Sequence, residues 1–131
     1  MRQNQRLALA ALLAVGFYGA AVVPASAHHS VASFNRNTPE VVTGVVKTWN
    51  WSNPHCWLVL MVPDGKGGTQ TWNLEGISAT GFVREGYGVD TLKPGETVRM
   101  LFAPRRDGAI GGEFLKVLQL NGQPFTPKTG S

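Results

Sequence analysis

Three histidines give the strongest chemical signal in this 131-residue chain, because two of them directly follow a cleavage motif. Ala25-Ser26-Ala27 has the small-x-small pattern that signal peptidases cut, and His28 and His29 come next. If cleavage falls after Ala27, the α-amine of His28 becomes free, and this amine and the His28 imidazole can chelate one metal ion. This arrangement is a histidine brace, which suits copper and needs a third nitrogen from elsewhere in the chain.

His55 is the candidate for that third nitrogen. It ends the segment Trp51-Ser52-Asn53-Pro54-His55, in which Asn53-Pro54 favours a turn and Pro54 stiffens the backbone. Cu(II) prefers nitrogen ligands in a tetragonal arrangement, and a terminal amine loses its proton at modest cost when a metal replaces it. His29 is the alternative third ligand or a nearby proton carrier. Adjacent side chains point apart in an extended chain, so the rings of His28 and His29 would not naturally share one ion.

Each histidine also has a simpler interpretation. A His-His pair at a chain end is often only a solvated terminus, and His55 is equally consistent with a structural ring that fixes the Asn53-Pro54 turn. Zinc is the second candidate ion, although no Cys/His spacing signature supports it. A metal site requires that the terminus and His55 meet, which the sequence does not establish.

The first 27 residues have the order of a secretory signal. Arg2 and Arg6 give a positive start, residues 7–23 are uncharged, and Pro24 precedes the cleavage motif. A membrane anchor is the alternative, since this stretch reaches the lower length limit for a spanning helix. Its many alanines make it weakly apolar, and no stop-transfer charge cluster follows. We therefore expect residues 1–27 to be removed and the protein to be exported to the periplasm or secreted, without stable membrane insertion.

The remaining 104 residues suffice for one small domain with a single core. Without Arg2 and Arg6, ten Lys/Arg stand against eight Asp/Glu, a net charge of about +2. This charge is too small to indicate a polyanionic partner, so nucleic acid is not expected. The single cysteine, Cys56, cannot form an intramolecular disulfide and lies in an apolar run, which predicts a buried small hydrophobic residue.

The pattern of the mature part predicts an all-β fold with one short helix. β-Branched and aromatic runs bounded by turn residues predict strands at 41–51, 55–62, 69–75, 97–103 and 112–120. Ser78 can cap a helix at 79–85, which Gly86 would end. Three strands, a helix and two strands are the layout of a small five-stranded OB-like barrel at residues 28–122. The polar tail at 123–131 is expected to be flexible.

The chain also resembles a bacterial family of short exported proteins, domain of unknown function 6152. The resemblance is based on four motifs: HHS at the mature start, V-x-G-V-V in the first strand, W-S-N-P-H before the second, and G-x-x-x-D-x-L-K-P-G-E before the fourth. It extends from about His28 to Gly122. It departs from the family pattern near Asn35, where a more polar or acidic residue is expected, and at 75–81. The resemblance implies a small exported β-barrel and no established activity.

Tryptophans suggest a second function. Trp49 and Trp51 share one face of the first predicted strand, and Trp57 lies on the next strand. In so small a fold most aromatic rings fill the core, but an OB-type sheet can also present them as a stacking platform. The alternative function is therefore an interaction module that binds a glycan, a peptide or a protein through Trp49, Trp51 and Trp57 or through an open sheet edge.

Enzymatic chemistry has little support in the sequence. It contains no glycine-rich phosphate loop, nucleophile elbow or HExxH motif. Glu75 and Glu85 could form a carboxylate pair, but nothing in the sequence fixes their separation. The sequence thus predicts a small exported binding domain that is not an enzyme, with copper at His28, His55 and optionally His29, and the interaction module as the alternative.

Overall fold

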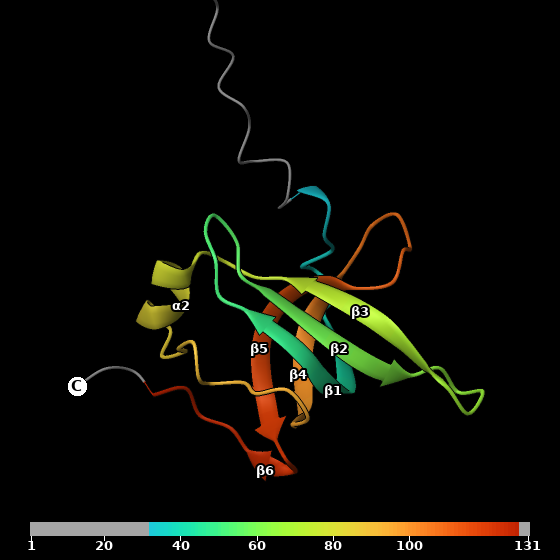
Figure 1. Cartoon of the computed structure of the whole chain (residues 1–131). Helices are drawn as coiled ribbons and strands as arrows, with labels where there is room; N and C mark the ends of the chain where they lie inside the picture. The colour runs from blue at the N-terminus through green and yellow to red at the C-terminus, as the bar shows by residue number, and fades with distance from the viewer. Residues whose placement is uncertain (1–31, 129–131) are drawn as a thin grey trace, which may run out of the picture.

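The structure is a computed structural model that describes residues 32–128. This part of the chain is mostly β, with a short helix, α2 (Ala79–Arg84), between the third and fourth strands (Figure 1). The strands are β1 (Glu40–Asn50), β2 (Trp57–Pro63), β3 (Thr69–Glu75), β4 (Thr97–Pro104), β5 (Gly112–Leu120) and β6 (Gln123–Pro124). The mainly β class and the predicted order of three strands, a helix and two strands are confirmed, and β6 is an additional, sixth strand.

All the strands belong to one sheet with the order β3-β2-β1-β4-β5-β6, and these neighbours pair antiparallel. In addition, β3 and β5 pair in parallel through Leu74↔Gly112 and Glu75↔Glu113. Hydrogen bonds therefore form a closed ring through five strands. The closing contact is short, so β3 and β5 are joined only where β3 ends and β5 begins.

A bulge in β1 decides which of its side chains face the core. Before the bulge the even-numbered positions Val42, Gly44 and Val46 are buried. The register with β2 shifts between Val46 and Thr48, and a shift of one residue exchanges the two faces of a strand. After the bulge the odd-numbered Trp49 and Trp51 pack against the core.

Helix α2 covers one end of the ring with an aromatic cluster. The Ser78 side chain accepts a hydrogen bond from the Gly81 amide at 3.1 Å, as an N-cap does, and Gly86 follows with a φ of 85°. A six-residue helix is too short to be stable alone, so packing must hold it. Phe82 provides that packing: it is 1% exposed, and its ring contacts those of Trp49, Trp51, Tyr87 and Phe114.

The C-terminal segment differs from the flexible tail expected at 123–131. Residues 123–124 pair with β5, the Phe125 amide donates to Leu118 O at 3.0 Å, and the Lys128 amide donates to Gly86 O at 3.1 Å. The Phe125 ring stacks on Tyr87 with centroids 5.7 Å apart. An apolar ring within a polar segment thus holds it against the core as far as Lys128. Residues 129–131 and the expected signal at 1–27 lie outside the described range.

Between Ala32 and Lys128, no helix has the length and apolar character needed to cross a membrane.

Candidate functional site

His55 ends the loop that joins β1 to β2, and this loop is fixed on both sides. The Asn53-Pro54 peptide bond is cis, and Ser52 Oγ donates to His55 O at 2.7 Å. The Asn53 side chain accepts a hydrogen bond from the Ala79 amide at 3.1 Å, and the Cys56 amide donates to Ile77 O at 2.9 Å. The segment that sequence analysis selected as a turn is therefore attached to the start of α2.

The His55 ring is oriented by one of its nitrogens. Nδ1 lies 2.9 Å from the carbonyl oxygen of Gly76 and 3.4 Å from Oε1 of Glu75. A carbonyl oxygen can only accept, so Nδ1 bears the hydrogen in this contact, and Nε2 of the neutral ring keeps its lone pair. The His55 side chain is 35% exposed. The ring is thus held from the protein side while part of it remains accessible.

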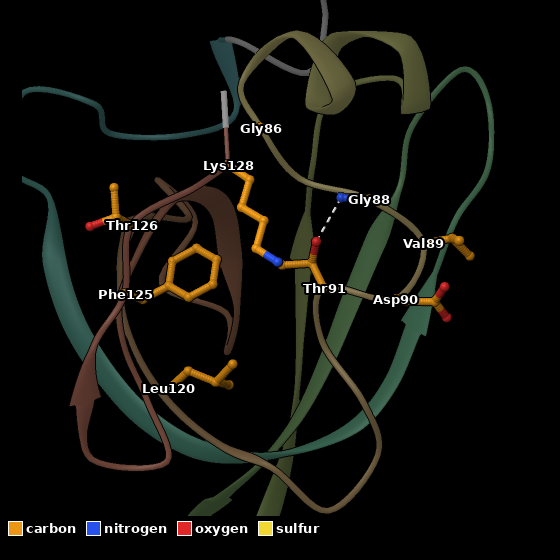
Figure 2. Close-up of a pocket in the computed structure, with 9 residues that line it drawn as sticks. All are labelled: Gly86, Gly88, Val89, Asp90, Thr91, Leu120, Phe125, Thr126 and Lys128. Atoms are coloured by element: carbon orange, nitrogen blue, oxygen red, sulfur yellow. Dashed lines mark hydrogen bonds between the residues drawn. The ribbon is translucent and has the colours of Figure 1, made fainter. Parts of the chain in front are cut away.

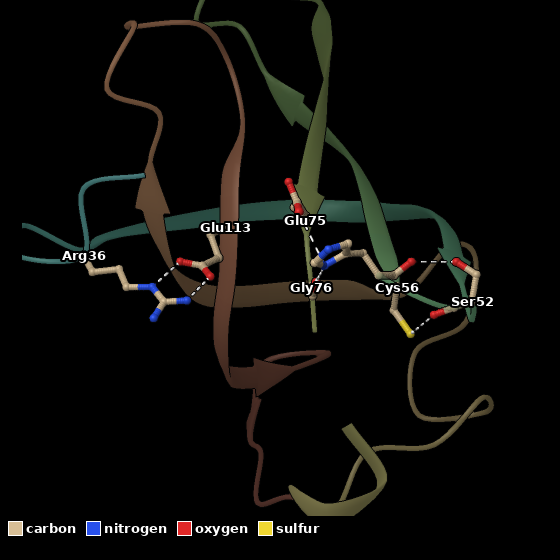
Figure 3. A network of polar contacts seen from close by, with 7 residues as sticks. Arg36, Ser52, Cys56, Glu75, Gly76 and Glu113 are labelled. Atoms are coloured by element: carbon tan, nitrogen blue, oxygen red, sulfur yellow. Dashed lines mark hydrogen bonds and ion pairs between the residues drawn. The ribbon is translucent and has the colours of Figure 1, made fainter. Parts of the chain in front are cut away.

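A second polar contact attaches the N-terminal segment to the same end of the sheet. Glu75 pairs across the β3–β5 junction with Glu113, which is 8% exposed. Figure 3 shows the Arg36 guanidinium facing the Glu113 carboxylate: Nε donates at 2.7 Å, and the second bond joins Nη2 to Oε1. The hydrogen bond to Glu113 raises the pKa of Arg36 above its usual value. A buried carboxylate is therefore neutralised by a residue that precedes β1.

The segment before Arg36 is also anchored. Phe34 is 3% exposed and forms a bridge with Arg105, and the Asn35 amide donates to Pro104 O at 2.8 Å. The pKa of Arg105 is raised mainly by its hydrogen bond to Asp107, and Glu75 makes a smaller contribution of the same sign. Arg36 contacts Glu113, Glu113 pairs with Glu75, and Glu75 contacts His55, so the N-terminal segment and the His55 loop lie at one end of the molecule.

The 105–111 loop beside this end has its own internal ion pair. Arg105 Nε and Nη2 donate to the two carboxylate oxygens of Asp107 at 3.0 and 2.6 Å, and the Ala109 amide donates to Asp107 at 3.0 Å. These hydrogen bonds, that of Arg105 first, lower the pKa of Asp107 to about 2. The loop is therefore ordered by its own side chains.

Metal ligands do not cluster within the described part of the chain. In residues 32–128, no three His, Cys, Asp or Glu side chains lie close enough together to hold a metal ion. A metal site that uses His55 would need ligands from the preceding residues, and His28 and His29 lie outside the described range. Cys56 is 0% exposed and its Sγ donates to Ser52 O at 3.3 Å, so the predicted burial of this thiol is confirmed (Figure 3).

The structure does not bring the three selected tryptophans onto one face. Trp49 and Trp51 lie together, with ring centroids 5.6 Å apart, in the aromatic cluster around Phe82. The Trp49 indole donates to Gly88 O at 3.0 Å. Trp57 is 37% exposed on the outward side of β2, where the neighbouring Leu58 points into the core. The rings that sequence analysis grouped as a platform are thus divided between the interior and the surface.

Sequence reasoning missed the partners of this site. Arg36 and Glu113 are 77 positions apart, and no local pattern links them. Glu75 was considered only as a partner of Glu85. The turn at 63–68 predicts a β2–β3 hairpin that places Glu75 opposite residues near His55, and the structure pairs Glu75 with Trp57. Hairpin register was the signal that could have found this contact.

Two hollows of similar size lie away from His55. One, of about 460 Å³, lies between the loop after α2 and the C-terminal segment (Figure 2), where the Gly88 amide donates to Thr91 Oγ1 at 2.6 Å. Phe125 and Lys128 line its other side. The second, of about 470 Å³, lies beside the 105–111 loop and has Trp72 and Phe102 in its wall.

Comparison with known proteins identifies a family but no activity. No curated protein and no solved structure matches the chain. A model of a family of unknown function, DUF6152, matches residues 18–114. Because this match covers most of the sequence, the chain belongs to the DUF6152 family.

Proposed function

We propose that the processed protein binds one copper ion through three nitrogens: the α-amine and ring of His28, and Nε2 of His55. The observation that favours this proposal most is the contact of His55 Nδ1 with Gly76 O, with Glu75 nearby. Histidines that bind metals usually donate their other ring N–H to a backbone carbonyl or a carboxylate, which fixes the tautomer and orients the ring. His55 has both kinds of partner.

The anchoring of the N-terminal segment supports this arrangement. Arg36 contacts Glu113, Glu113 pairs with Glu75 across the β3–β5 junction, and Glu75 contacts His55. The segment is therefore held at the end of the sheet where His55 lies. His28 precedes the buried Phe34 by six positions, and an extended chain of that length spans about 20 Å.

His29 and the choice of metal are secondary parts of the proposal. His29 would serve as a proton carrier, or replace His55 as third ligand. The first role suits an extended chain better, because there the side chain of His29 points away from that of His28. Zinc is the second ion, since nitrogen ligands and a water also suit it. Export rests on the signal-like order of residues 1–27, and removal of that segment is required to free the amine.

The tryptophan platform of the interaction-module alternative has less support. This platform of Trp49, Trp51 and Trp57 would need the three rings on one face, and only Trp57 of the three is exposed on the outer side of the sheet. A single exposed ring is common on protein surfaces and does not indicate a ligand.

The test compares proteins that differ only at the terminus. Cu(II) is titrated into protein that begins at His28, with the terminus verified by intact mass, and into the same protein with three glycines before His28. Three glycines keep His28 and His29 away from the second and third positions, where a histidine would form a new Cu(II) chelate with the added terminal amine. The extension converts the amine into an amide, so we expect at least an approximately 10-fold loss of affinity, and His55→Ala should lose about as much. His29→Ala distinguishes the two candidates for the third ligand: affinity close to that of the unaltered protein is expected with His55 as the ligand, and a loss would assign the position to His29. Equal affinity with and without the three glycines would refute the brace.

A further inference from the structure

We propose that the free edge of β3, residues 69–72, binds an extended peptide that adds one strand to the sheet. The site does not depend on copper. On the side away from β2, β3 pairs with β5 only at Leu74 and Glu75. Gly111 packs against the next residue of β3, Asn73, since a Cβ on Gly111 would lie 2.4 Å from Asn73 O. Between Thr69 and Trp72 no backbone pairing covers this edge within the part of the chain that the structure describes.

This edge lacks the features that usually prevent strand pairing. Proteins protect exposed edges with charged residues, prolines or very short strands. The other end of the strand order has such protection, since β6 has two residues and ends in Pro124. The stretch Thr69-Gln70-Thr71-Trp72-Asn73 contains neither a charge nor a proline. The edge of β3 is therefore open to a further strand.

A hollow lies at the Trp72 end of the open edge. It has a volume of about 470 Å³, and Trp72 lines it on the β3 side. Pro104 and the glycine-rich end of the 105–111 loop line the other side, and Figure 1 shows this loop arching beside β3. The Arg105–Asp107 pair orders the loop, so this loop forms one wall of the hollow and β3 forms the other. A peptide in the hollow would pair with β3 on the side where β5 pairs with Leu74, and would extend that pairing toward Thr69.

Trp72, which lines the hollow, has a hydrogen-bond donor without an acceptor. Its Nε1 is buried and has no hydrogen-bond partner in residues 32–128. The ring is held by edge contact with Phe102, with centroids 5.3 Å apart. Native proteins rarely leave a buried donor without a partner. Rotation of the indole toward the hollow would let a peptide carbonyl oxygen accept this hydrogen bond.

These observations favour a peptide over other partners. The unpaired edge offers backbone donors and acceptors, and the indole needs an acceptor, so an extended main chain meets both needs. Glu40, Arg105 and Arg106 line the hollow and have mixed charge, which gives no preference for a polyanion. A second copy of this chain would bring its whole sheet to the edge, beside the 105–111 loop, whereas a peptide would bring one strand. Apolar side chains of the peptide that contact Trp72 and Phe102 would make binding selective for the peptide sequence.

The test starts from a random-peptide phage library, panned on the protein that begins at His28, with and without Cu(II). An enriched peptide is synthesised and added to ¹⁵N-labelled protein. We expect edge amides of Thr69–Trp72 to become protected from hydrogen exchange and the Trp72 Hε1 signal to move downfield. Trp72→Phe keeps an aromatic ring but removes the donor and should weaken binding about 10-fold. Trp57→Phe, on the outward face of β2, is the matched control and should bind like the original protein.

Ile110→Glu provides a second variant that does not disturb the core, because Ile110 is 54% exposed and lines the hollow. A carboxylate there should also weaken binding. The proposal is overturned if no peptide is enriched, if the chemical-shift changes lie on another surface, or if both variants bind as the original protein does. Protection of the β3 amides in a dimer without peptide would assign the edge to a second copy instead. If peptide binding is the same with and without Cu(II), the peptide site is independent of the proposed metal site.

Discussion

The carbonyl oxygen of Gly76 lies 2.9 Å from Nδ1 of His55, and this contact determines which ring nitrogen is free. In the neutral ring, the hydrogen must lie on Nδ1 because a carbonyl cannot donate. Glu75 Oε1, at 3.4 Å from the same nitrogen, favours the same arrangement. The relationship is a property of the metal-free protein, so it can be tested without copper.

We predict that neutral His55 is the Nδ1–H tautomer. In a ¹⁵N NMR spectrum recorded without metal, Nδ1 should have a pyrrole-like shift and Nε2 a pyridine-like shift. Glu75→Gln should keep this preference, because Gly76 O remains, whereas an unconstrained histidine such as that of a peptide gives a mixture. A predominantly Nε2–H form would contradict the structure and remove the main support for Nε2 as the metal ligand.

Loss of the Arg36 guanidinium should destabilise the fold. Arg36→Met leaves the Glu113 carboxylate, 8% exposed, without its bidentate partner. Removing one partner of a fully buried pair costs 3–5 kcal/mol, but the Arg36 side chain is 49% exposed, so we expect about 2 kcal/mol. Urea unfolding measures the change. Arg105→Met is the control, since its partner Asp107 is exposed and the loss should be small. Equal unfolding free energies for both variants would be inconsistent with this interpretation.

The ion pair in the 105–111 loop should persist at low pH. The pKa of Asp107 is lowered from 3.8 to about 2 in the folded protein. A carboxylate with a lowered pKa stabilises the folded state above its unfolded pKa, and this contribution disappears as the pH falls through the folded value. Asp107 should therefore remain ionised at pH 3, and an NMR titration of its carboxyl carbon should show a midpoint near 2. In Arg105→Met the midpoint should rise toward 3.8, and an unchanged midpoint would rule out Arg105 as the main cause.

Two glycines of this loop should respond differently to alanine. Gly108 and Gly111 both have positive φ, 76° and 100°, but nothing lies within 4 Å of a Cβ on Gly108. At Gly111 the Cβ would lie 2.4 Å from Asn73 O. Gly108→Ala should cost about 1 kcal/mol of unfolding free energy and Gly111→Ala clearly more, because the close approach to β3 must open. Thermal or urea unfolding compares them, and equal losses would mean that the loop does not pack on β3 in solution.

Much of the fold could be predicted because its signals are local. The alternation of Thr71 and Asn73 with Trp72 and Leu74 identified β3 with the bounds that the structure has. Ser78 and Gly86 likewise bounded α2, since a cap and a positive-φ residue act within one turn of the helix.

The candidate site was predicted less completely because it depends on distant pairs. The contact between Arg36 and Glu113 and the bridge between Phe34 and Arg105 join residues that leave no periodic pattern in the sequence. The division of the tryptophans followed from the β1 bulge, where one extra residue moved Trp49 and Trp51 to the core side. The β6 pairing was missed because two residues are too few to give a strand pattern.

The closing contact between Leu74 and Gly112 has a consequence for synthesis of the chain. During translation the first three strands leave the ribosome well before β5, so Leu58, Leu60 and Leu74 lack their final cover until Gly112 and the residues after it emerge. The nascent chain must therefore remain incompletely folded until most of its length has been synthesised. Premature termination before β5 would leave an apolar β-meander exposed to proteases and to aggregation.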